Sequence, residues 1–398
     1  MVYIIDEPSV GLHPEDIAKI NEILKSLKDK GNTVLIVEHD PDVIKEGDYI
    51  IDMGPGSGKN GGEITFEGTY NELLSSNTST GNALRNKHNL KENIRESNHF
   101  YNIGPVTQNN LNNVKTSIPK HVLTVLTGVA GSGKSTLVKA GFENNDHTIF
   151  IDQKAVQGSN RSNLLTYLGV FDSVRSFFSK ETGLNKAMFS YNSKGACPNC
   201  GGKGYIKTEL AFMGDFSQTC EVCHGKRYKQ EVLDATIDGY SIADVLDLTV
   251  DEGIIFFDKK NDIKSKLQSV SKTGLNYMSL GQPLSTLSGG EIQRVKLAQH
   301  LDEEIKNSIF IFDEPTTGLH ESDIPILMEC FDDLIDQNNT VILIEHNLSI
   351  MCEADWIIDV GPGPGLDGGK VQFSGTPKNF IDSSETLTSK HLKRYINQ

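Results

Sequence analysis

The feature that most constrains the fold is a long internal repeat. Residues 3–17 (YIIDEPSVGLHPEDI) align with residues 310–324 (FIFDEPTTGLHESDI), an offset of 307 residues, which is 310 minus 3. The same offset matches NTVLIVEHD with NTVILIEHN without a gap, and the two copies end near Thr69 and Thr376. A repeat of this kind predicts two structural units of the same design in one chain.

Each copy has the sequence pattern of an α/β structure. An apolar strand is followed by an acidic turn, an amphipathic helix, a second apolar strand ending in Glu-His, and a glycine-rich turn that leads to a short strand. This alternation predicts a parallel sheet with crossover helices. The segments VYIID, TVLIVEH, FIFD and TVILIEH are continuously apolar, so we expect all four to be buried central strands.

The two copies differ in what precedes them. Residues 75–100 are polar and poor in large apolar side chains, which indicates a linker with a helical portion. The second copy follows a long segment that has no counterpart before the first copy. We therefore expect residues 1–85 to be the last part of one domain, residues 86–100 to be a linker, and residues 101–398 to be a second, complete domain.

Composition and charge argue against several classes of protein. The chain has no run of about 18 apolar residues and no signal-peptide pattern at its N-terminus, so we expect a soluble, cytoplasmic protein without a membrane partner. The formal charge of -15 argues against nonspecific coating of nucleic acid, so any contact with DNA must be local. Cys330 and Cys352, which stand alone, are expected to be buried apolar residues.

A glycine-rich segment predicts a nucleotide site. GVAGSGKS at residues 128–135 fits the pattern G-x-x-x-x-G-K-[ST], follows the apolar strand HVLTVLT and precedes the helical segment TLVKAGF. In that context backbone N–H groups wrap the phosphates, the lysine reaches the outer phosphates, and the serine hydroxyl can ligate Mg²⁺. The residues predicted to contact nucleotide are Gly128, Gly131, Ser132, Gly133, Lys134, Ser135 and Thr136.

An acidic pair at the end of a strand is the expected partner of this loop. IFIFDE at residues 309–314 places Asp313 to hold Mg²⁺, directly or through water. The adjacent Glu314 is placed to orient or deprotonate an attacking water. Alone, such a pair is usually a solvated turn, and its combination with the phosphate loop favours the catalytic interpretation.

A third motif brings in a family resemblance. LSGGEIQRVKLA at residues 287–298 predicts a glycine turn that opens a helix, whose N-terminus suits an anion. With this ordered set of motifs the chain resembles the ATP-binding-cassette (ABC) superfamily. The resemblance implies that Ser288, Gly289 and Gly290 close on the γ-phosphate of a site built by a second cassette. It also implies that Gln153 in IFIDQ is the Q-loop residue and His346 in LIEHN the switch histidine.

The same resemblance implies that a partner is required. In this family the catalytic residues and the signature of one cassette lie on opposite faces and do not form one site. Residues 1–85 resemble the end of a first cassette, with Asp6, Glu7 and His39 but no phosphate loop or signature. The signature that covers Lys134 is then expected from a second copy of the chain, as a homodimer, or from a missing N-terminal cassette half.

Four cysteines in two pairs predict a zinc site. Cys197, Cys200, Cys220 and Cys223 form CxxC and CxxC separated by nineteen residues, and four thiolates can enclose one tetrahedral Zn²⁺. A disulfide or an unligated core is the less favoured alternative, and His224 is surplus. Residues 205–219 resemble a hairpin. The module, about 190–235, has only a slight positive excess, so we expect a mainly structural role, with contact to nucleic acid still open.

The combination of cassette and cysteine insertion resembles the UvrA family. TGVAGSGKSTL, IDQ, the cysteine insertion, SLGQPLSTLSGGEIQRVKLA, DEPTTGLH and IDVGPGPG follow one another in the order of that family, over essentially the whole chain. The resemblance implies a helical signature region at about 236–300, ATP, Mg²⁺ and Zn²⁺ as cofactors, and DNA binding across a dimer. It further implies damage recognition in nucleotide excision repair, with UvrB as a possible partner.

Two departures keep alternatives open. The segment AVQGSNRS after Gln153 retains only Arg161 of an arginine-rich family motif, and the first cassette's phosphate loop and DNA-contacting insertions are not in this sequence. The chain could instead be a paralogue linked to antibiotic self-resistance, or a truncated half that binds nucleotide as an interaction module without turnover. A transporter ATPase is disfavoured because the cysteine insertion is foreign to that class.

Overall fold

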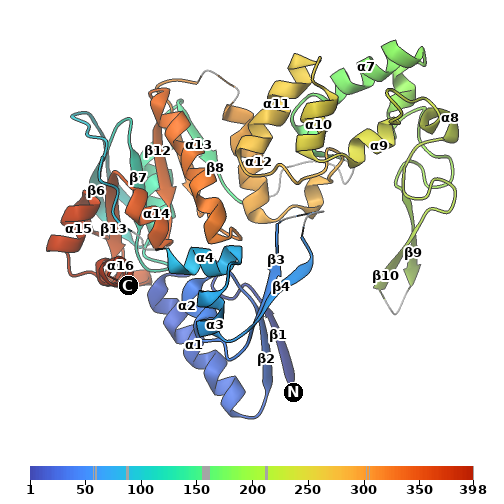
Figure 1. Cartoon of the computed structure of the whole chain (residues 1–398). Helices are drawn as coiled ribbons and strands as arrows, with labels where there is room; N and C mark the ends of the chain where they lie inside the picture. The colour runs from blue at the N-terminus through green and yellow to red at the C-terminus, as the bar shows by residue number, and fades with distance from the viewer. Residues whose placement is uncertain are drawn as a thin grey trace. The chain divides into compact units, whose positions relative to one another are not determined.

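The computed structural model (Figure 1) describes residues 1–56, 58, 61–86, 89–154, 162–210, 214–301, 303 and 305–397. Arg161, singled out above, lies outside these residues. The chain forms two compact units. The first contains Met1–Gln153 and Glu303–Gln398, and the second contains Lys154–Asp302. The proposed domain boundaries follow the repeat and therefore divide the chain in a different way.

A six-stranded sheet organises the first unit. Its strand order is β14 (Lys370–Gly375), β13 (Trp356–Gly361), β7 (Leu123–Thr127), β12 (Thr340–Ile344), β11 (Ile309–Asp313) and β8 (Thr148–Ile151). All neighbouring pairs are parallel except β13 with β14. Every residue of β7 and β12 is buried, as expected for continuously apolar strands in the middle of a parallel sheet. The predicted α/β fold class is confirmed.

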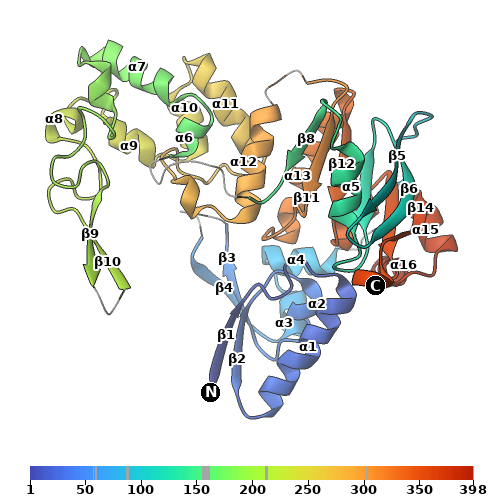
Figure 2. The same ribbon diagram turned by 180° about the vertical axis from the view of Figure 1, so that it is seen from behind.

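Helices and a hairpin cover the two faces of this sheet. On one face α13 (Ile324–Asp336) packs over β12 and β7, with Phe331 against Phe312 (Figure 1). On the other face lie α5 (Lys134–Phe142) and the hairpin of β5 (Phe100–Gln108) and β6 (Leu111–Pro119), as Figure 2 shows. Alternate strand residues face each layer: Ile309 and Ile311 belong to the core under α5, and Phe312 faces α13. The sheet is thus buried on both sides.

The first repeat has the same register as the second but not the same burial. β1 (Val2–Asp6) pairs in parallel with β2 (Thr33–Val37), and β3 (Ile50–Gly54) is antiparallel to β4 (Glu63–Gly68). Both pairings keep the offset of 307 to β11–β12 and β13–β14, including the bulge after Asp52 and Asp359. The prediction that β1 and β2 are buried central strands is wrong. Among the described residues each pairs only with the other, and Ile4 is 73% exposed.

Short helices complete both repeats. In the first these are α1 (Pro14–Asp29), α2 (Pro41–Ile44), α3 (Tyr70–Ser75) and α4 (Ser79–Arg85). In the second, besides α13, they are α14 (Leu348–Glu353), α15 (Pro377–Ser383), α16 (Leu387–Tyr395) and the 3-10 turns η4 (Glu321–Asp323) and η5 (Gly365–Asp367). Between the repeats, Arg95 is held by Asp332 at 2.8 Å and by Asp355 at 3.6 Å, so this segment is fixed to the second repeat.

The second unit is mainly helical around its own apolar core. Its helices are α6 (Leu164–Tyr167), α7 (Phe171–Thr182), α8 (Gln230–Leu233), α9 (Ile242–Asp247), α10 (Val250–Phe256), α11 (Asn261–Lys272) and α12 (Gly289–Leu301), with 3-10 turns η2 (Lys186–Phe189) and η3 (Leu284–Thr286). Phe178, Phe189, Phe257 and Leu267 are among its fully buried side chains. The expected hairpin is present as β9 (Tyr205–Leu210) and β10 (Gly214–Thr219).

Within the part of the chain that the structure describes, no helix has both the length and the apolar character needed to span a membrane.

Candidate nucleotide site and metal centre

The glycine-rich loop connects β7 to α5. Gly128, Gly131 and Gly133 all have positive φ, at 130°, 71° and 104°. At Gly128 a Cβ would lie 1.9 Å from the carbonyl oxygen of Val360, so this position admits only glycine. The loop leads directly into the first turn of α5, where unpaired backbone N–H groups and the helix dipole favour a phosphate. Its geometry is therefore suited to an anion.

Lys134 is folded back over this loop. Its Nζ donates to the carbonyl oxygens of Gly128 at 2.9 Å and Val129 at 3.0 Å, and the side chain is buried. Burial lowers the pKa of Lys134 to about 8, against the opposing effect of the Glu314 and Asp359 carboxylates. A phosphate would supply a stronger acceptor than these carbonyl groups.

The acidic pair lies at the end of β11 beside the loop. Asp313 accepts a hydrogen bond from the Ser135 hydroxyl at 3.3 Å and is 3.5 Å from Lys139 Nζ. Glu314 follows with φ of 54°, a left-handed conformation that is unusual for a residue with a side chain. Burial, with the Glu345 and Asp313 charges, raises the pKa of Glu314 to about 7. A carboxyl in that range can accept a proton near neutral pH.

Gln153 and His346 reach the same acidic turn. Gln153 Nε2 donates to the Glu314 carbonyl oxygen at 3.3 Å and to Thr317 Oγ1 at 2.9 Å. His346 Nε2 lies 3.8 Å from Glu314 Oε1. Burial, followed by the Lys134 charge, lowers the pKa of His346 well below its usual range, and among the described residues its Nδ1 has no hydrogen-bond partner. The structure thus brings four predicted segments to one place: the phosphate loop, Gln153, the acidic pair and His346.

Two other hydroxyls of the loop are also placed. Ser132 is fully buried, and its Oγ has no partner within the described chain, while Thr136 Oγ1 accepts a hydrogen bond from Asn109 Nδ2 at 3.1 Å. Because Ser132 is enclosed, its hydroxyl would reach a bound anion only if the loop adjusts, whereas Thr136 is half-buried.

The predicted signature residues lie in the other unit. Gly289 and Gly290 open α12, and Ser288 precedes them. The Ser288 N–H donates to Glu291 Oε2 at 2.8 Å, and Ser288 Oγ accepts from the Glu291 N–H at 3.3 Å. This reciprocal pair has the form of a capping box and starts the helix sharply. The turn therefore presents a helix N-terminus, the feature that the sequence predicted.

Glu345 is a site residue that sequence reasoning did not single out. Its side chain is buried and accepts four hydrogen bonds. Oε1 accepts from Thr316 N at 3.0 Å and Thr316 Oγ1 at 2.5 Å, and Oε2 accepts from the N–H groups of His346 at 2.8 Å and Asn347 at 3.1 Å. It therefore fixes both the acidic turn and the backbone of His346. The recurrence of Glu-His in the repeat was the available signal.

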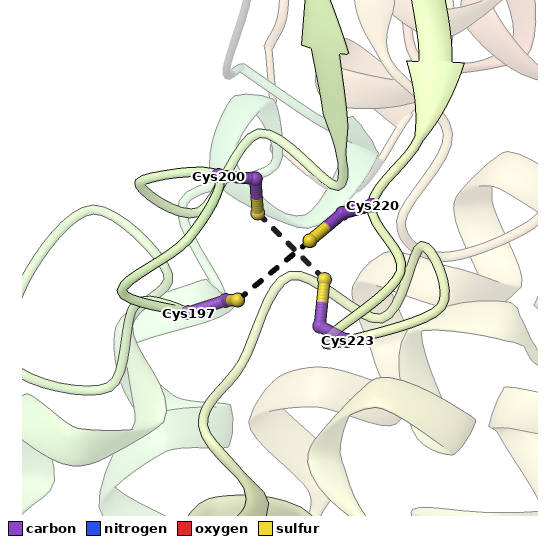
Figure 3. A group of neighbouring side chains, drawn as sticks. All are labelled: Cys197, Cys200, Cys220 and Cys223. Carbon is purple, nitrogen blue, oxygen red and sulfur yellow. Dashed lines mark hydrogen bonds between the residues drawn. The ribbon is translucent and has the colours of Figure 1, made fainter.

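The four paired cysteines converge on one centre (Figure 3). All four are buried, and their sulfur atoms lie within 4.8 Å of one another. Cys197 and Cys220 are 3.9 Å apart, and Cys200 and Cys223 3.7 Å, close to the roughly 3.8 Å that tetrahedral Zn–S bonds of about 2.3 Å produce. These distances are far longer than a disulfide bond of about 2 Å. The cluster fits a tetrahedral ion.

Polar groups around the cysteines suit a metal-bound thiolate. The Gly204 N–H donates to Cys200 Sγ at 3.2 Å, and Asn199 Nδ2 donates to Cys220 Sγ at 3.3 Å. Gly202 and Gly204 have φ of 78° and 84°, and a Cβ at Gly202 would lie 1.8 Å from the Tyr191 carbonyl oxygen. The glycines after the first cysteine pair thus allow the tight turn around the sulfur atoms.

Comparison with known proteins gives the family. The model of the family described as ABC transporter matches residues 111–317, just over half of the 398 residues, and this range includes the phosphate loop, the signature and the acidic pair. The chain belongs to the ABC family. Within that family its similarity to UvrA extends over its whole length, so the predicted resemblance is confirmed.

The chain is similar to about half of each of several UvrA-type proteins. UvrABC system protein A of Aquifex aeolicus is 42% identical over 100% of the chain and 46% of that protein. The protein of the same name from Bacillus subtilis is 42% identical, over 100% of the chain and 45% of the relative. The crystal structure of UvrA2 from Deinococcus radiodurans gives a TM-score of 0.92 at 39% identity and covers 99% of this chain and 52% of that one. The chain spans about half the length of these relatives.

Replacement of Glu345 by glutamine tests its role in the site. An amide retains one acceptor oxygen but turns an NH₂ group toward N–H donors that are buried with it, which costs about 2 kcal/mol. We expect Glu345→Gln to lower the melting temperature by about 4–8 °C. The control is Glu38→Gln, the same position of the first repeat, where the half-buried carboxylate bonds Ser9, His39 and Asp40 and solvent can replace it. Equal losses in the two variants would contradict this assignment.

Proposed function

We propose that this chain is a UvrA-type ABC subunit that binds ATP with Mg²⁺, hydrolyses it, and acts on DNA in nucleotide excision repair as part of damage recognition. One observation supports it most: Lys134, Gln153, the adjacent pair Asp313 and Glu314, and His346 come from four separate segments and lie together at the edge where β7, β8, β11 and β12 end. The 42% identity to UvrABC system protein A supports the repair context.

Each residue has a role that follows from its position. The backbone N–H groups of the loop and Lys134 bind the phosphates, and Ser135 and Asp313, 3.3 Å apart, are placed to hold Mg²⁺, which neutralises phosphate charge when bound. Glu314, with its pKa raised to about 7, orients the attacking water and accepts its proton. His346 and Gln153 both lie against Glu314 and would be placed to respond to the γ-phosphate of a bound nucleotide. Lys134 exchanges its carbonyl acceptors for phosphate oxygens.

A signature from another cassette completes the site in this proposal. Ser288, Gly289 and Gly290 offer a helix N-terminus to the γ-phosphate of a partner, and the partner offers its own to Lys134. A second copy of this chain, or the corresponding part of another cassette, could supply it. ATP then closes the dimer, and hydrolysis opens it. Without such a partner the chain binds nucleotide as an interaction module, which is the competing outcome.

Zn²⁺ is the ion we propose for the four cysteines. Four thiol groups gathered within 4.8 Å of one another are typical of a structural zinc site. In this role the ion joins the two CxxC turns that flank the hairpin β9–β10 and so stabilises this part of the chain. DNA is the proposed partner, through local contacts because the chain carries a charge of -15. A UvrB-like protein as a second partner and a cytoplasmic location are part of the same proposal.

ATP hydrolysis by the zinc-loaded chain tests the proposal. We expect Lys134→Ala to weaken ATP binding and Glu314→Gln to retain binding while turnover falls at least about 100-fold, since it removes the base. The matched control is Glu7→Gln, the same change in the same left-handed turn of the first repeat. Turnover is measured by phosphate release across protein concentration, with and without damaged duplex DNA.

The outcomes separate the two functions. Turnover that rises with protein concentration and responds to DNA supports the UvrA-type repair ATPase. ATP binding with no turnover under any condition supports the interaction module. Turnover in Lys134→Ala and Glu314→Gln equal to that of the unmodified chain rules out the assigned site.

Metal analysis tests the cysteine assignment. We expect one zinc ion per chain, lost in Cys197→Ser, together with faster amide hydrogen exchange in residues 195–230, because the metal contributes to the stability of this module. Cys330→Ser, a buried cysteine of α13 outside the cluster, is the control and keeps its zinc. Full zinc content in Cys197→Ser would be incompatible with a four-cysteine site.

A further inference from the structure

The last helix, α16, joins the first repeat to the second. Thr388, His391 and Tyr395 lie on one face, at spacings of three and four residues. His391 Nε2 lies 3.1 Å from Glu15 Oε2 at the start of α1, and Tyr395 OH lies 2.7 Å from Ser349 Oγ on α14. α14 begins two residues after His346. One helix thus contacts the first repeat and the proposed ATP site.

Thr388 is the centre of a directed chain of hydrogen bonds. His13 Nδ1 accepts a hydrogen bond from the Glu15 N–H at 3.2 Å, so the proton of the neutral ring resides on Nε2. Nε2 lies 3.0 Å from Thr388 Oγ1 and donates to it. The Thr388 hydroxyl in turn donates to Asp359 Oδ1 at 3.2 Å. All three side chains are at least 98% buried, and burial lowers the pKa of His13 to about 4, which keeps the ring neutral.

This series of hydrogen bonds ends beside the phosphate loop. Asp359 lies on β13, and its Oδ1 is 3.1 Å from the position that a Cβ would take at Gly128. Its carboxylate is also one of the charges that raise the pKa of Lys134 against the effect of burial. At the other end, the His13 ring meets the His346 ring edge to face, with centroids 6.0 Å apart and planes at 86°. A residue of the first repeat therefore reaches two parts of the second repeat's site.

The same series of hydrogen bonds occurs a second time, with the histidine now in the second repeat and the aspartate in the first. His320 Nδ1 accepts from the Ser322 N–H at 3.2 Å, and its Nε2 lies 3.1 Å from Thr80 Oγ1. Thr80 donates to Asp52 Oδ1 at 2.7 Å, and the His320 ring meets that of His39 at 6.3 Å and 88°.

This duplication argues for a selected arrangement. The histidines and aspartates are 307 residues apart, as the repeat requires. The two threonines come from α4 and α16, which follow the repeated segment, yet both reach the same position between histidine and aspartate. Burial of the polar set His13, Thr388 and Asp359 is costly unless every member is satisfied, and the half-buried counterpart repeats the same donor and acceptor order.

We propose that His13 is a positioning residue for ATP turnover, through which the first repeat holds the phosphate loop and His346 of the second repeat by way of Thr388 and Asp359. This inference rests on the proposed ATPase function. It gives the first repeat a role within the same chain that needs no nucleotide bound to that repeat.

Thr388→Val tests the proposal, because valine has the shape of threonine without the hydroxyl. We expect the amide hydrogen exchange of residues 128–136 to become about tenfold faster, and kcat to fall about tenfold with KM for ATP changed less than threefold. Thr388→Ser keeps the hydroxyl and restores both values. The matched control is Thr80→Val, which breaks the second series of hydrogen bonds, between His320, Thr80 and Asp52. We expect it to leave the exchange of residues 128–136 and kcat within about twofold of the unmodified chain.

ATP turnover tests the proposed function, and amide hydrogen exchange tests the coupling of His13 to the phosphate loop separately. If the unmodified chain shows no turnover, the ATPase proposal fails, and the exchange of residues 128–136 still decides the coupling. Faster exchange in Thr388→Val but not in Thr80→Val supports the proposal. Equal exchange in both variants, or unchanged exchange in Thr388→Val with a lower melting temperature in each, overturns it, since the threonines would then have a structural role only.

Discussion

The candidate site depends on one constraint, which is that parallel strands end at the same edge of their sheet. β7, β12 and β11 are neighbours, and each is followed at that edge by a polar turn. The phosphate loop follows β7, Glu345 and His346 follow β12, and Asp313 and Glu314 lie at the end of β11. The registers of these strands, which pair Ile309 with Thr340 and Val341 with Leu123, set the heights of the polar groups. They bring Lys134 and Glu314 close enough for their charges to interact.

The repeat builds the same edge twice with different results. Glu7 and Glu314 both adopt left-handed conformations, and Glu38 and Glu345 both accept N–H groups of the following turn. In the second repeat Glu345 is buried and Glu314 is half-buried, whereas in the first repeat Glu38 and Glu7 are both half-buried and β1 and β2 leave alternate residues exposed. The half-buried Glu38 is thus held in a less fixed and better solvated arrangement than the buried Glu345. The first repeat is linked to the phosphate loop through His13, which is fully buried and bonds Thr388.

The sequence predicted the local elements better than the contacts between distant segments. The strand and turn pattern, the glycine-rich loop, the hairpin between the cysteine pairs and the clustering of those cysteines all follow from spacing within short segments. The burial of β1 was wrongly predicted because an apolar strand does not reveal how many neighbours it has. His13, Thr388 and Asp359 were not found, because nothing in the spacing of residues 375 positions apart indicates that they touch. Glu345 was passed over since a buried acid at a strand end resembles an ordinary polar turn.

The most direct test of the account is the number of nucleotides that one chain binds. Titration calorimetry of the Glu314→Gln variant with ATP and Mg²⁺ measures this without hydrolysis. The account predicts one nucleotide per chain, at Lys134, and none when Lys134→Ala is added to the same variant. Two nucleotides per chain, or one that persists after Lys134→Ala, would show that the site is not the one built where β7, β11 and β12 end.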